Sequence, residues 1–415
     1  MASSPPSSKP QRLVPKAPRE TTVMVIAGGV WQVDLIQRAK GLGYRVVNTN
    51  LYPDSPGFAH ADVGVVADVL DREANLAIAR EHTVDAVVTD QSDIAVPTVA
   101  FVAAELGLPS IGPDVAARFT DKGLMRELTQ RAGFPTLPFA LCASVGDANR
   151  AAAAIGFPLV VKPPQSQSSR GVTIVRHPDE LPAAVDGARD FAGGRPILVE
   201  RFIAGTEHTV EGVVVAGRHH TLSISEKLAF PDQPTIARRL TYRHRHPGRE
   251  LETLRAQHDR LVESLGLPFG LTHAEYIDSP DGWILIEVAA RGGGTRISSR
   301  VVPAMTGVDT QRLLLSMSLG YEPEDPQPTE STPEVVALDF HAFVPGVIAD
   351  IQGVERARAL PGVLDLEVNM APGDEARPAE DDRSRHAHAI VHARDEEQLQ
   401  KTLEEVWETL EVTYV

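Results

Sequence analysis

The sequence predicts a multidomain chain of α/β and α+β architecture, and three observations support this fold class. The chain has 415 residues, enough for two or three domains with buried cores. Between residues 22 and 113, short β-rich runs alternate with helical segments, the pattern of a parallel sheet with crossover helices. Further along, β-rich runs are joined by short turns, which is typical of antiparallel strands.

Composition excludes several classes of protein. A hydrophobic content of 42% and a charged content of 23% are ordinary for a globular protein, and the formal net charge of -16 argues against general nucleic-acid binding. No apolar run reaches the length of a membrane span, and residues 1–20 read as a disordered Ser/Pro-rich tail without the apolar core of a secretory signal. The single cysteine, Cys142, lies in an apolar context typical of a buried thiol. We therefore expect a cytoplasmic protein that acts on small molecules and binds neither nucleic acid nor membrane, with a homodimer left open.

The first domain is expected over residues 21–115 and has a Rossmann-like parallel sheet. Its strands are predicted in "TVMVIAGG", "YRVVNTN", "ADVGVVAD" and "DAVVTD", and its helices over residues 31–40, 72–81 and 94–106. Gly28 and Gly29 follow the first strand, but the full dinucleotide fingerprint is absent, which favours a structural turn.

Residues 114–133 read as one helix that carries Lys122, and a small subdomain follows at about 140–205. Within it, "GFPLVVKPPQSQSSRGVTIV" reads as a strand that ends at Lys162, a polar loop, and a strand that begins near Gly171. A hairpin tip with backbone amides and hydroxyls, such as those of Ser168 and Ser169, can fold over phosphates. Polar hairpin tips without such a role are also common.

An arginine-rich stretch and an acidic stretch mark the second half of the chain. "ARRLTYRHRHPGRE", residues 237–250, reads either as a solvated basic loop or as a lid that neutralises a phosphate or a carboxylate. Residues 321–334 form an acidic, proline-rich linker, and residues 335–415 read as a small α+β domain.

The stretch "LTHAEYIDSPDGWILIEVAARGGG", residues 271–294, reads as an antiparallel hairpin because "SPDG" is turn chemistry between two β-rich runs. If three residues connect the strands, Glu275 and Glu287 lie directly opposite each other, with Cβ atoms about 5 Å apart. Side chains alternate along a strand, so His273 shares the face of Glu275, and Arg291 shares that of Glu287. One face of the hairpin would then hold two carboxylates and a guanidinium.

Like charges placed directly opposite each other repel. A hard divalent cation between the oxygens would remove the repulsion, and Mg2+ held by one or two carboxylates and substrate phosphates is a common arrangement. The hairpin therefore predicts a magnesium site at Glu275 and Glu287. The alternative is an exposed hairpin on which Arg291 bridges two surface acids.

Several separated motifs, taken in order, resemble the ATP-grasp superfamily. They are Lys122, Lys162 at the end of "LVVKP", Glu200 and Glu207 across "ERFIAGTE", and "EY" followed by "ILIEVAAR". The resemblance covers residues 22–320, and the last segment is similar to the closing domain of the L-amino acid ligase branch, which includes bacilysin-type dipeptide-forming enzymes. It implies an ATP-grasp domain over residues 116–320, between the N-terminal domain and the linker.

The resemblance also implies an activity and a set of site residues. The activity is ATP-dependent joining of a carboxylate to an amine through an acylphosphate, as in antibiotic biosynthesis. The implied ATP-binding residues are Lys122 and Lys162 at the phosphates, Ser168, Ser169 and Gly171 above them, Glu200, Arg201, Phe202 and Ile203 as a strand edge at adenine, and Glu207 at the ribose. Glu275 and Glu287 would hold Mg2+ (or Mn2+), and Arg291 would stabilise charge on the reacting groups.

Three further residues are substrate candidates. His273 could orient an acid or contact substrate, or it could cap the hairpin. Arg296 and Ser298 follow the triple glycine and could bind a substrate carboxylate at the start of a helix. Arg296 could equally be an ordinary surface residue.

Two departures from the superfamily pattern leave other functions open. Ala289 stands where the superfamily usually has an asparagine that binds Mg2+, and the phosphate-covering loop has only one glycine. The alternatives are an ATP-grasp ligase for a nucleoside or purine-pathway substrate, and a non-catalytic ATP-binding sensor. A biotin-dependent carboxylase is disfavoured because the sequence has no recognisable biotin-carrier motif.

Overall fold

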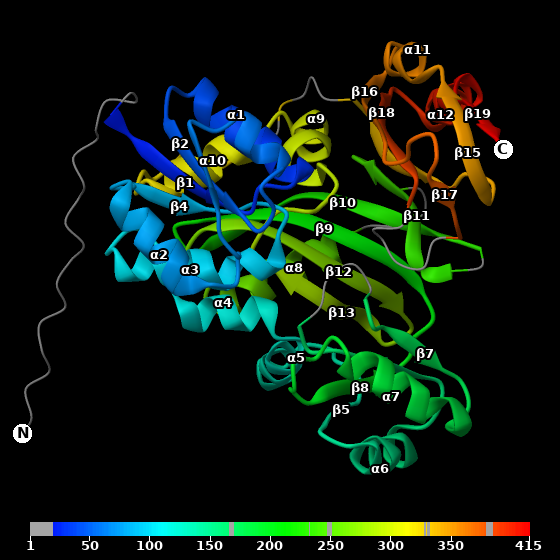
Figure 1. Cartoon of the computed structure of the whole chain (residues 1–415). Coiled ribbons are helices and arrows are strands. Elements are labelled where there is room, and N and C mark those ends of the chain that lie inside the picture. The colour runs from blue at the N-terminus through cyan, green and yellow to red at the C-terminus, as the bar shows by residue number, and fades with distance from the viewer. Residues whose placement is uncertain are drawn as a thin grey trace, which may run out of the picture.

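The structure of the protein is a computed structural model, and it describes residues 20–165, 170–231, 233–246, 251–327, 329, 333–378 and 385–415. A small N-terminal sheet lies at one end, long strands cross the middle, and two smaller lobes complete the molecule (Figure 1). Among the residues that the structure describes, no helix combines the length and the apolar character needed to cross a bilayer.

The N-terminal domain contains a four-stranded parallel sheet in the order β3-β2-β1-β4. The strands are β1 (Thr22–Ile26), β2 (Arg45–Asn50), β3 (Val63–Val66) and β4 (Ala86–Val88), and the main helices are α1 (Val33–Gly41), α2 (Arg72–Glu81) and α3 (Val96–Glu105). Short turns η2 (Val30–Gln32), η3 (Pro56–Ala59) and η4 (Asp93–Ala95) follow three of the strands. The buried apolar run of β1 needs cover on both faces, which the helices supply. The predicted parallel sheet is confirmed.

The predicted single helix over residues 114–133 is wrong, because it is two helices, α4 (Pro113–Thr120) and α5 (Lys122–Arg131). Asp121 breaks the run with an extended backbone, and its side chain caps α5 by accepting from the amides of Gly123 and Leu124. Lys122 therefore becomes the first residue of α5. Its own amide donates to the carbonyl of Pro164, at 3.0 Å.

A small lobe contains an antiparallel sheet in the order β5-β8-β6-β7. Its elements are β5 (Phe139–Cys142), α6 (Val145–Ile155), β6 (Leu159–Lys162), β7 (Thr173–Val175), η5 (Pro178–Glu180), α7 (Leu181–Arg189) and β8 (Ile197–Arg201). Alanine-rich faces of the two helices pack on the sheet. Cys142 belongs to this core, so the expected buried thiol is confirmed.

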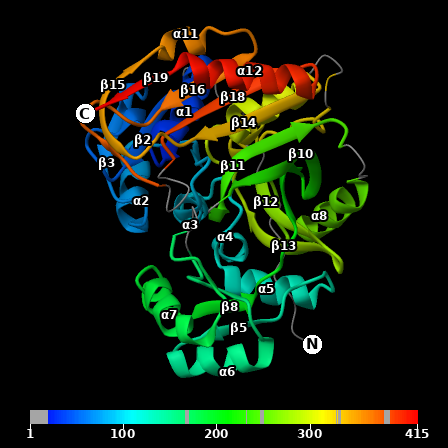
Figure 2. The same cartoon turned by 90° about the vertical axis from the view of Figure 1, so that its right-hand side faces the viewer.

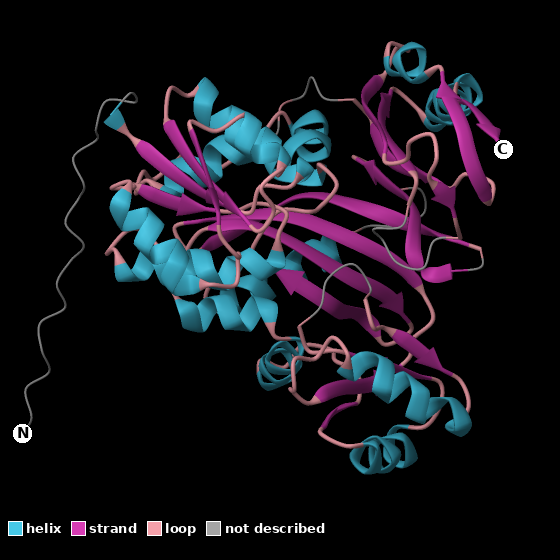
Figure 3. Ribbon diagram, viewed as in Figure 1, coloured by secondary structure: helices cyan, strands magenta, loops and turns pink. Residues whose placement is uncertain are grey.

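The central sheet has eight antiparallel strands in the order β13-β12-β9-β10-β11-β14-β18-β16. The strands are β9 (Thr206–Val215), β10 (Arg218–Phe230), β11 (Gln233–Arg243), β12 (Gly270–Ser279), β13 (Gly282–Ala289), β14 (Val335–His341), β16 (Val363–Val368) and β18 (Ala387–Ala393). Helix α8 (Glu252–Leu265) covers one face through an apolar cluster. These long strands dominate the middle of Figure 3.

The C-terminal segment extends this sheet, because β11 pairs with β14 from Arg239↔Asp339 to Arg243↔Val335. A second sheet, in the order β17-β15-β19, consists of β15 (Gly346–Gln352), β17 (Glu375–Ala376) and β19 (Glu411–Tyr414). The helices here are α11 (Val354–Arg358) and α12 (Glu396–Thr409), and α12 packs on β14 and β18 (Figure 2). The sheet thus runs past the acidic stretch at 321–334, and the division of the chain into domains stays a proposal.

The arginine-rich stretch is only partly a loop, which corrects the first interpretation. Arg238, Arg239 and Arg243 lie in β11, where Arg239 pairs with Asp339 and Arg243 with Glu396. The alternation in "ARRLTYR" gave no distinct strand signal beside its three arginines, whereas the pairing of β11 with β10 and β14 fixes it as a strand. Residues 247–250 lie outside the described residues.

Candidate active site

The β12–β13 hairpin places Glu275 directly opposite Glu287, as predicted. The expected three-residue connection is wrong, however, because Ser279 pairs with Gly282 and only two residues form the turn. The register is restored by one extra residue in β13, Ile286, which forms a bulge. The carbonyl of Ile286 accepts a hydrogen bond from Arg126, at 2.7 Å.

The two opposing carboxylates have different neighbours. Glu287 Oε1 accepts from Lys122 Nζ at 2.8 Å, and Glu275 Oε1 lies 3.8 Å from His273 Nε2. Burial raises the pKa of Glu275, but the neighbouring His273 and the charge of Lys227 outweigh it and lower this pKa to about 2. Glu275 and Glu287 are 33% and 25% exposed, whereas Lys122 is 8% exposed, so the carboxylates are the accessible members of the group.

These carboxylates form a donor set that fits a hard divalent cation. Both are oxygen ligands, both are accessible, and they oppose each other across one strand pair. Mg2+ is commonly held by one or two carboxylates while substrate phosphates and water complete its shell. Ala289 contributes no ligand and is buried. The site can therefore hold Mg2+ through Glu275 and Glu287.

Lys162 belongs to a buried ion triad with Glu200 and Arg126. Arg126 Nε donates to Glu200 Oε2 at 2.9 Å, and Lys162 Nζ pairs with Glu200 Oε1. Burial raises the pKa of Glu200, but the charges of Arg126 and then Lys162 prevail and lower it to about 2. Burial also lowers the pKa of Lys162, with Glu200 acting in the opposite direction.

Sequence reasoning missed Arg126, which is 1% exposed. A usable signal was present, because Arg126 lies four residues after Lys122 and so on the same face of α5. Arg126 bonds both Glu200 and the bulge carbonyl of Ile286, and it thereby joins the small lobe to the β12–β13 hairpin.

We predict that Arg126→Met lowers the free energy of unfolding by about 3 kcal/mol, because it leaves a buried carboxylate with one cation fewer. Urea unfolding measures the change. Arg131→Ala is the matched control on the same helix, where an exposed pair with Glu127 contributes about 0.5 kcal/mol or less. Equal stability losses in the two variants would contradict the structural role of Arg126.

The segment expected to read adenine is not a strand edge, which is a correction. Strand β8 lies between β5 and β6, so Glu200 has paired strands on both sides, and Arg201 pairs with Leu159 of β6. The Phe202 amide beyond the strand donates to the Pro158 carbonyl at 3.0 Å. Ile203 follows outside the ladder. The expectation of an edge strand was wrong because the sequence does not indicate the order of the strands in this lobe.

The other predicted ATP-binding residues are distributed around this lobe. Glu207, at the start of β9, accepts from Lys227 Nζ at 2.6 Å. Gly171 has a φ of 68°, and a Cβ there would lie 2.7 Å from Phe191, so glycine suits the position on two counts. Ser168 and Ser169 lie outside the described residues.

Arg291 is held by an acid that sequence reasoning also missed. Its Nε and Nη2 donate to the two oxygens of Asp93 at 2.9 and 2.7 Å. Burial raises the pKa of Asp93, but the charge of Arg291 outweighs it, and the pKa is lowered. Asp90 accepts from the Gly292 amide at 3.1 Å and from Ser298 Oγ at 2.7 Å. The sequence did contain a signal for these two acids, because Asp90 and Asp93 follow the buried strand β4. Ligand sites often form at the carboxyl ends of such parallel strands.

His273 is paired with a buried acid, Glu211, on the neighbouring strand β9. Its Nδ1 lies 2.7 Å from Glu211 Oε1, and Glu211 also accepts from Tyr242 at 3.3 Å. Burial lowers the pKa of His273, but the charge and hydrogen bond of Glu211 prevail and raise it to about 9. His273 stands within the strand, opposite Ala289, so the hairpin-cap alternative is wrong.

The raised pKa of His273 predicts a pH-dependent stability. Protonated His273 stabilises the fold below pH 6.5, and this contribution, up to about 3 kcal/mol, is lost as the pH rises toward about 9. We expect urea unfolding of the metal-free protein to show this loss, and His273→Gln to remove it. His60→Gln, at an exposed histidine, should keep the wild-type profile. A wild-type stability that does not fall over this range would contradict the Glu211 pairing.

Arg296 and Ser298 do not present their polar groups to an open helix start. The Arg296 guanidinium contacts Asp365 and Glu367, and Ser298 donates to Asp90. The expected helix is η6 (Ile297–Val301), a single π-helical turn, followed by α9 (Val302–Thr306) and α10 (Thr310–Ser318). Arg296 is 14% exposed at the side chain, which excludes the ordinary-surface alternative.

Comparison with known proteins matches two parts of the chain to described families. Residues 155–299 match the ATP-grasp domain, and residues 340–415 match the L-amino acid ligase C-terminal domain 2. Over 193 residues the chain is 32% identical to the formate-dependent phosphoribosylglycinamide formyltransferase of Azoarcus sp. (strain BH72), covering 46% of this chain and 49% of that protein. The chain thus spans about half the length of the curated relatives it matches.

Solved structures share the fold over 95% of this chain. The L-amino acid ligase from Bacillus licheniformis superposes with a TM-score of 0.80 at 22% identity, covering 95% of this chain and 99% of that one. The biotin carboxylase domain of the Hydrogenobacter thermophilus 2-oxoglutarate carboxylase, a dimer in complex with MgADP and bicarbonate, has a TM-score of 0.75 at 22% identity and covers 95% of this chain and 90% of that one. At these identities the likeness establishes the fold, which is the predicted ATP-grasp fold.

Proposed function

The chain carries an ATP-grasp domain and an L-amino acid ligase C-terminal domain, and from this pairing we propose that it is an ATP-dependent carboxylate-amine ligase. Its substrates are an amino acid or a related carboxylate, and an amine. The observation that carries the proposal is the opposition of Glu275 and Glu287 on one sheet face, with Lys122 bonded to Glu287.

The reaction has two steps, and each suits the charges of the site. A carboxylate oxygen attacks the γ-phosphorus of ATP, the bond to ADP breaks, and an acylphosphate forms. The amine nitrogen then attacks the carbonyl carbon, its surplus proton is lost, and phosphate leaves with the electrons of the C–O bond. Phosphoryl transfer offers a protein little covalent work, so catalysis depends on positioning and charge neutralisation.

The cationic residues divide between the two steps. Lys122 and Lys162 contact the ATP phosphates as point charges, and both are held by carboxylates, Glu287 and Glu200. Mg2+ (or Mn2+), bound by Glu275 and Glu287, would neutralise charge on the phosphates. Arg291, fixed in place by Asp93, stabilises negative charge on the acylphosphate and on the tetrahedral intermediate.

The adenosine part of ATP binds next to the small lobe in this proposal. Phe202 and Ile203, after β8, lie at adenine, and Glu207 accepts from the ribose hydroxyls while Lys227 holds its carboxylate. Ser168, Ser169 and Gly171 cover the phosphates. His273 presents Nε2 toward Glu275 and contacts substrate or orients that acid.

The match of the C-terminal segment to an L-amino acid ligase domain supports the choice of an amino-acid substrate. A dipeptide-like product, as in antibiotic biosynthesis, is part of the proposal. One observation favours a second candidate, a ligase for a purine-pathway substrate. It is the 193-residue match at 32% identity to a formate-dependent phosphoribosylglycinamide formyltransferase. That match leaves more than half of the chain uncovered, so the amino-acid ligase is preferred.

The test is ADP and phosphate formation with ATP and Mg2+ against an array of amino-acid pairs, each amino acid also tested alone. Pair-dependent ADP formation would support the proposal and identify the substrates. Formate with phosphoribosylglycinamide, the substrate in the name of that relative, tests the second candidate in the same assay. AMP formation would overturn the acylphosphate route, and ATP binding without turnover would favour a non-catalytic sensor.

A further inference from the structure

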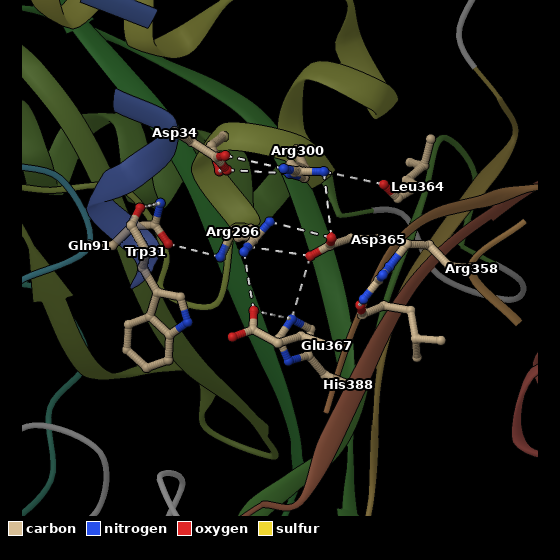
Figure 4. A network of polar contacts seen from close by, with 12 residues as sticks. Trp31, Asp34, Gln91, Arg296, Arg300, Arg358, Leu364, Asp365, Glu367 and His388 are labelled. Carbon is tan, nitrogen blue, oxygen red and sulfur yellow. Dashed lines mark hydrogen bonds and ion pairs between the residues drawn. The ribbon is translucent and has the colours of Figure 1, made fainter. Parts of the chain in front are cut away.

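Arg296 lies where three parts of the chain meet. It follows Arg291 and the triple glycine after β13, and its guanidinium points toward Asp365, Glu367 and His388 of the C-terminal segment (Figure 4). We call these four residues, together with Arg300 and Asp34, the Arg296 cluster. Asp34 belongs to helix α1 of the N-terminal domain.

The contacts of the cluster tie the catalytic segment to both flanking domains. Arg296 donates to Asp365 Oδ1 at 3.3 Å and to Glu367 Oε2 at 3.2 Å. Arg300, one helical turn further on, donates to both oxygens of Asp34 at 3.2 and 3.3 Å and to the Leu364 carbonyl at 3.3 Å. The Arg296, Asp365 and Glu367 side chains are 14%, 11% and 22% exposed, so these ion pairs are shielded from solvent.

Asp365, Glu367 and His388 place their ligand atoms within 4.8 Å of one another, an arrangement that could hold a cation. The Arg296 guanidinium already lies within 3.3 Å of both carboxylates and supplies the positive charge at that point. The cluster is therefore accounted for as an ion-pair network centred on a protein cation.

The backbone beside this network is strained. Thr295 and Arg296 have φ values of 50° and 62°, a left-handed backbone conformation that residues other than glycine seldom adopt. The Arg296 amide donates to Gln91 Oε1 at 2.8 Å, and Gln91 itself has a φ of 58°. Such residues persist where their surroundings fix them, and they concentrate at functional sites.

The same segment is pinned on its other side by acids of the N-terminal domain. Asp93 holds the Arg291 guanidinium, and Asp90 binds the Gly292 amide and Ser298. The turn from Arg291 to Ser298 thus has two sets of anchors. One set is Asp90 and Asp93, and the other is Asp365 and Glu367.

We propose that Arg296 is a positioning residue, anchored by Asp365 and Glu367, that fixes the strained turn and thereby the placement of Arg291. The proposal rests on the proposed function, because Arg291 acts there on the reacting groups. It replaces the expectation that Arg296 binds a substrate carboxylate directly. Its consequence is that the C-terminal domain takes part in catalysis through this contact.

A double-mutant cycle separates the two roles of Arg296. Arg296→Ala and the pair Asp365→Asn/Glu367→Gln should each lower kcat by about 10- to 100-fold, since a small misplacement of a reacting group has that effect. Combining all three changes should add little, because the residues act as one unit. ADP affinity should stay within about twofold of wild type in every variant. Arg296→Lys, which can reach one carboxylate, should retain intermediate activity.

Direct binding of a substrate carboxylate predicts a different pattern. Arg296→Ala would raise KM, whereas Asp365→Asn/Glu367→Gln would free the guanidinium and leave KM unchanged or lower. That pattern, or full additivity of the changes, would overturn the proposal. Arg38→Ala is the matched control, because Arg38 of α1 pairs with Asp309, the residue that caps α10, and not with any residue of the turn. It should keep wild-type kcat.

Amide hydrogen exchange of residues 292–301 gives a readout that does not depend on turnover. Faster exchange there in Arg296→Ala and in Asp365→Asn/Glu367→Gln, with wild-type exchange in Arg38→Ala, supports the anchor even if no ligation is found. If the wild-type protein shows no amine-dependent ADP formation, that result counts against the proposed function and leaves the anchor untouched. Unchanged exchange in both cluster variants would refute the anchor.

Discussion

Glu287→Gln is expected to reduce amine-dependent ADP formation by about a thousandfold, because a carboxamide is a poor ligand for Mg2+ and metal ions contribute several kcal/mol to such reactions. The change keeps the size of the side chain and removes one of the two opposing charges. It also removes the carboxylate partner of Lys122, at 2.8 Å. Initial rates at increasing Mg2+ concentration measure the effect, and added Mg2+ should restore only part of the rate.

The control is Asp281→Asn, which removes a carboxylate from the exposed turn of the same hairpin. It should keep the wild-type rate. The free energy of unfolding of Glu287→Gln should stay within about 1 kcal/mol of wild type, since the lost ion pair is partly exposed and a like-charge opposition is relieved. A near-normal rate for Glu287→Gln would refute the metal assignment.

Arg291→Ala is expected to lower kcat by about 100- to 1000-fold, the effect of removing one group that stabilises developing charge. It also leaves Asp93, whose side chain is only 14% exposed, without its bidentate partner, which should cost about 3 kcal/mol of stability. The two losses have different origins. They can therefore be separated.

The double variant Arg291→Ala/Asp93→Asn separates them, because it removes the uncompensated charge together with the guanidinium. We expect most of the stability to return, measured by urea unfolding, while kcat stays as low as in Arg291→Ala. Asp93→Asn alone keeps Arg291 and should lose less activity than either. Recovery of kcat in the double variant would mean that Arg291 serves only to neutralise Asp93.

Features encoded locally were predictable. The parallel N-terminal sheet followed from alternating runs, and helix α2 has the bounds expected from its pattern. The opposition of Glu275 and Glu287 was predicted from turn chemistry and strand alternation, although a two-residue turn and a bulge at Ile286 produce it. The ATP-grasp fold followed from a resemblance that several separated motifs carried together.

Features that depend on partners far along the chain were not predictable. Arg126 meets Glu200 across 74 residues, Asp93 meets Arg291 across 198, and Arg296 meets Asp365 across 69. The central position of β8 and the strand character of β11 likewise follow from which strands lie beside them. No local sequence pattern indicates which residues or strands become neighbours in the fold.

The sequence by itself determined which side chains could do the chemistry, because residue type and strand periodicity are local properties. It supplied two lysines, two opposing glutamates and an arginine in the order of an ATP-grasp site. Only the tertiary structure decided what holds them, since ion pairing depends on distance in space. The acids around Arg291, the partners of Lys162 and the anchors of Arg296 lie far away in the sequence, and folding brings them together.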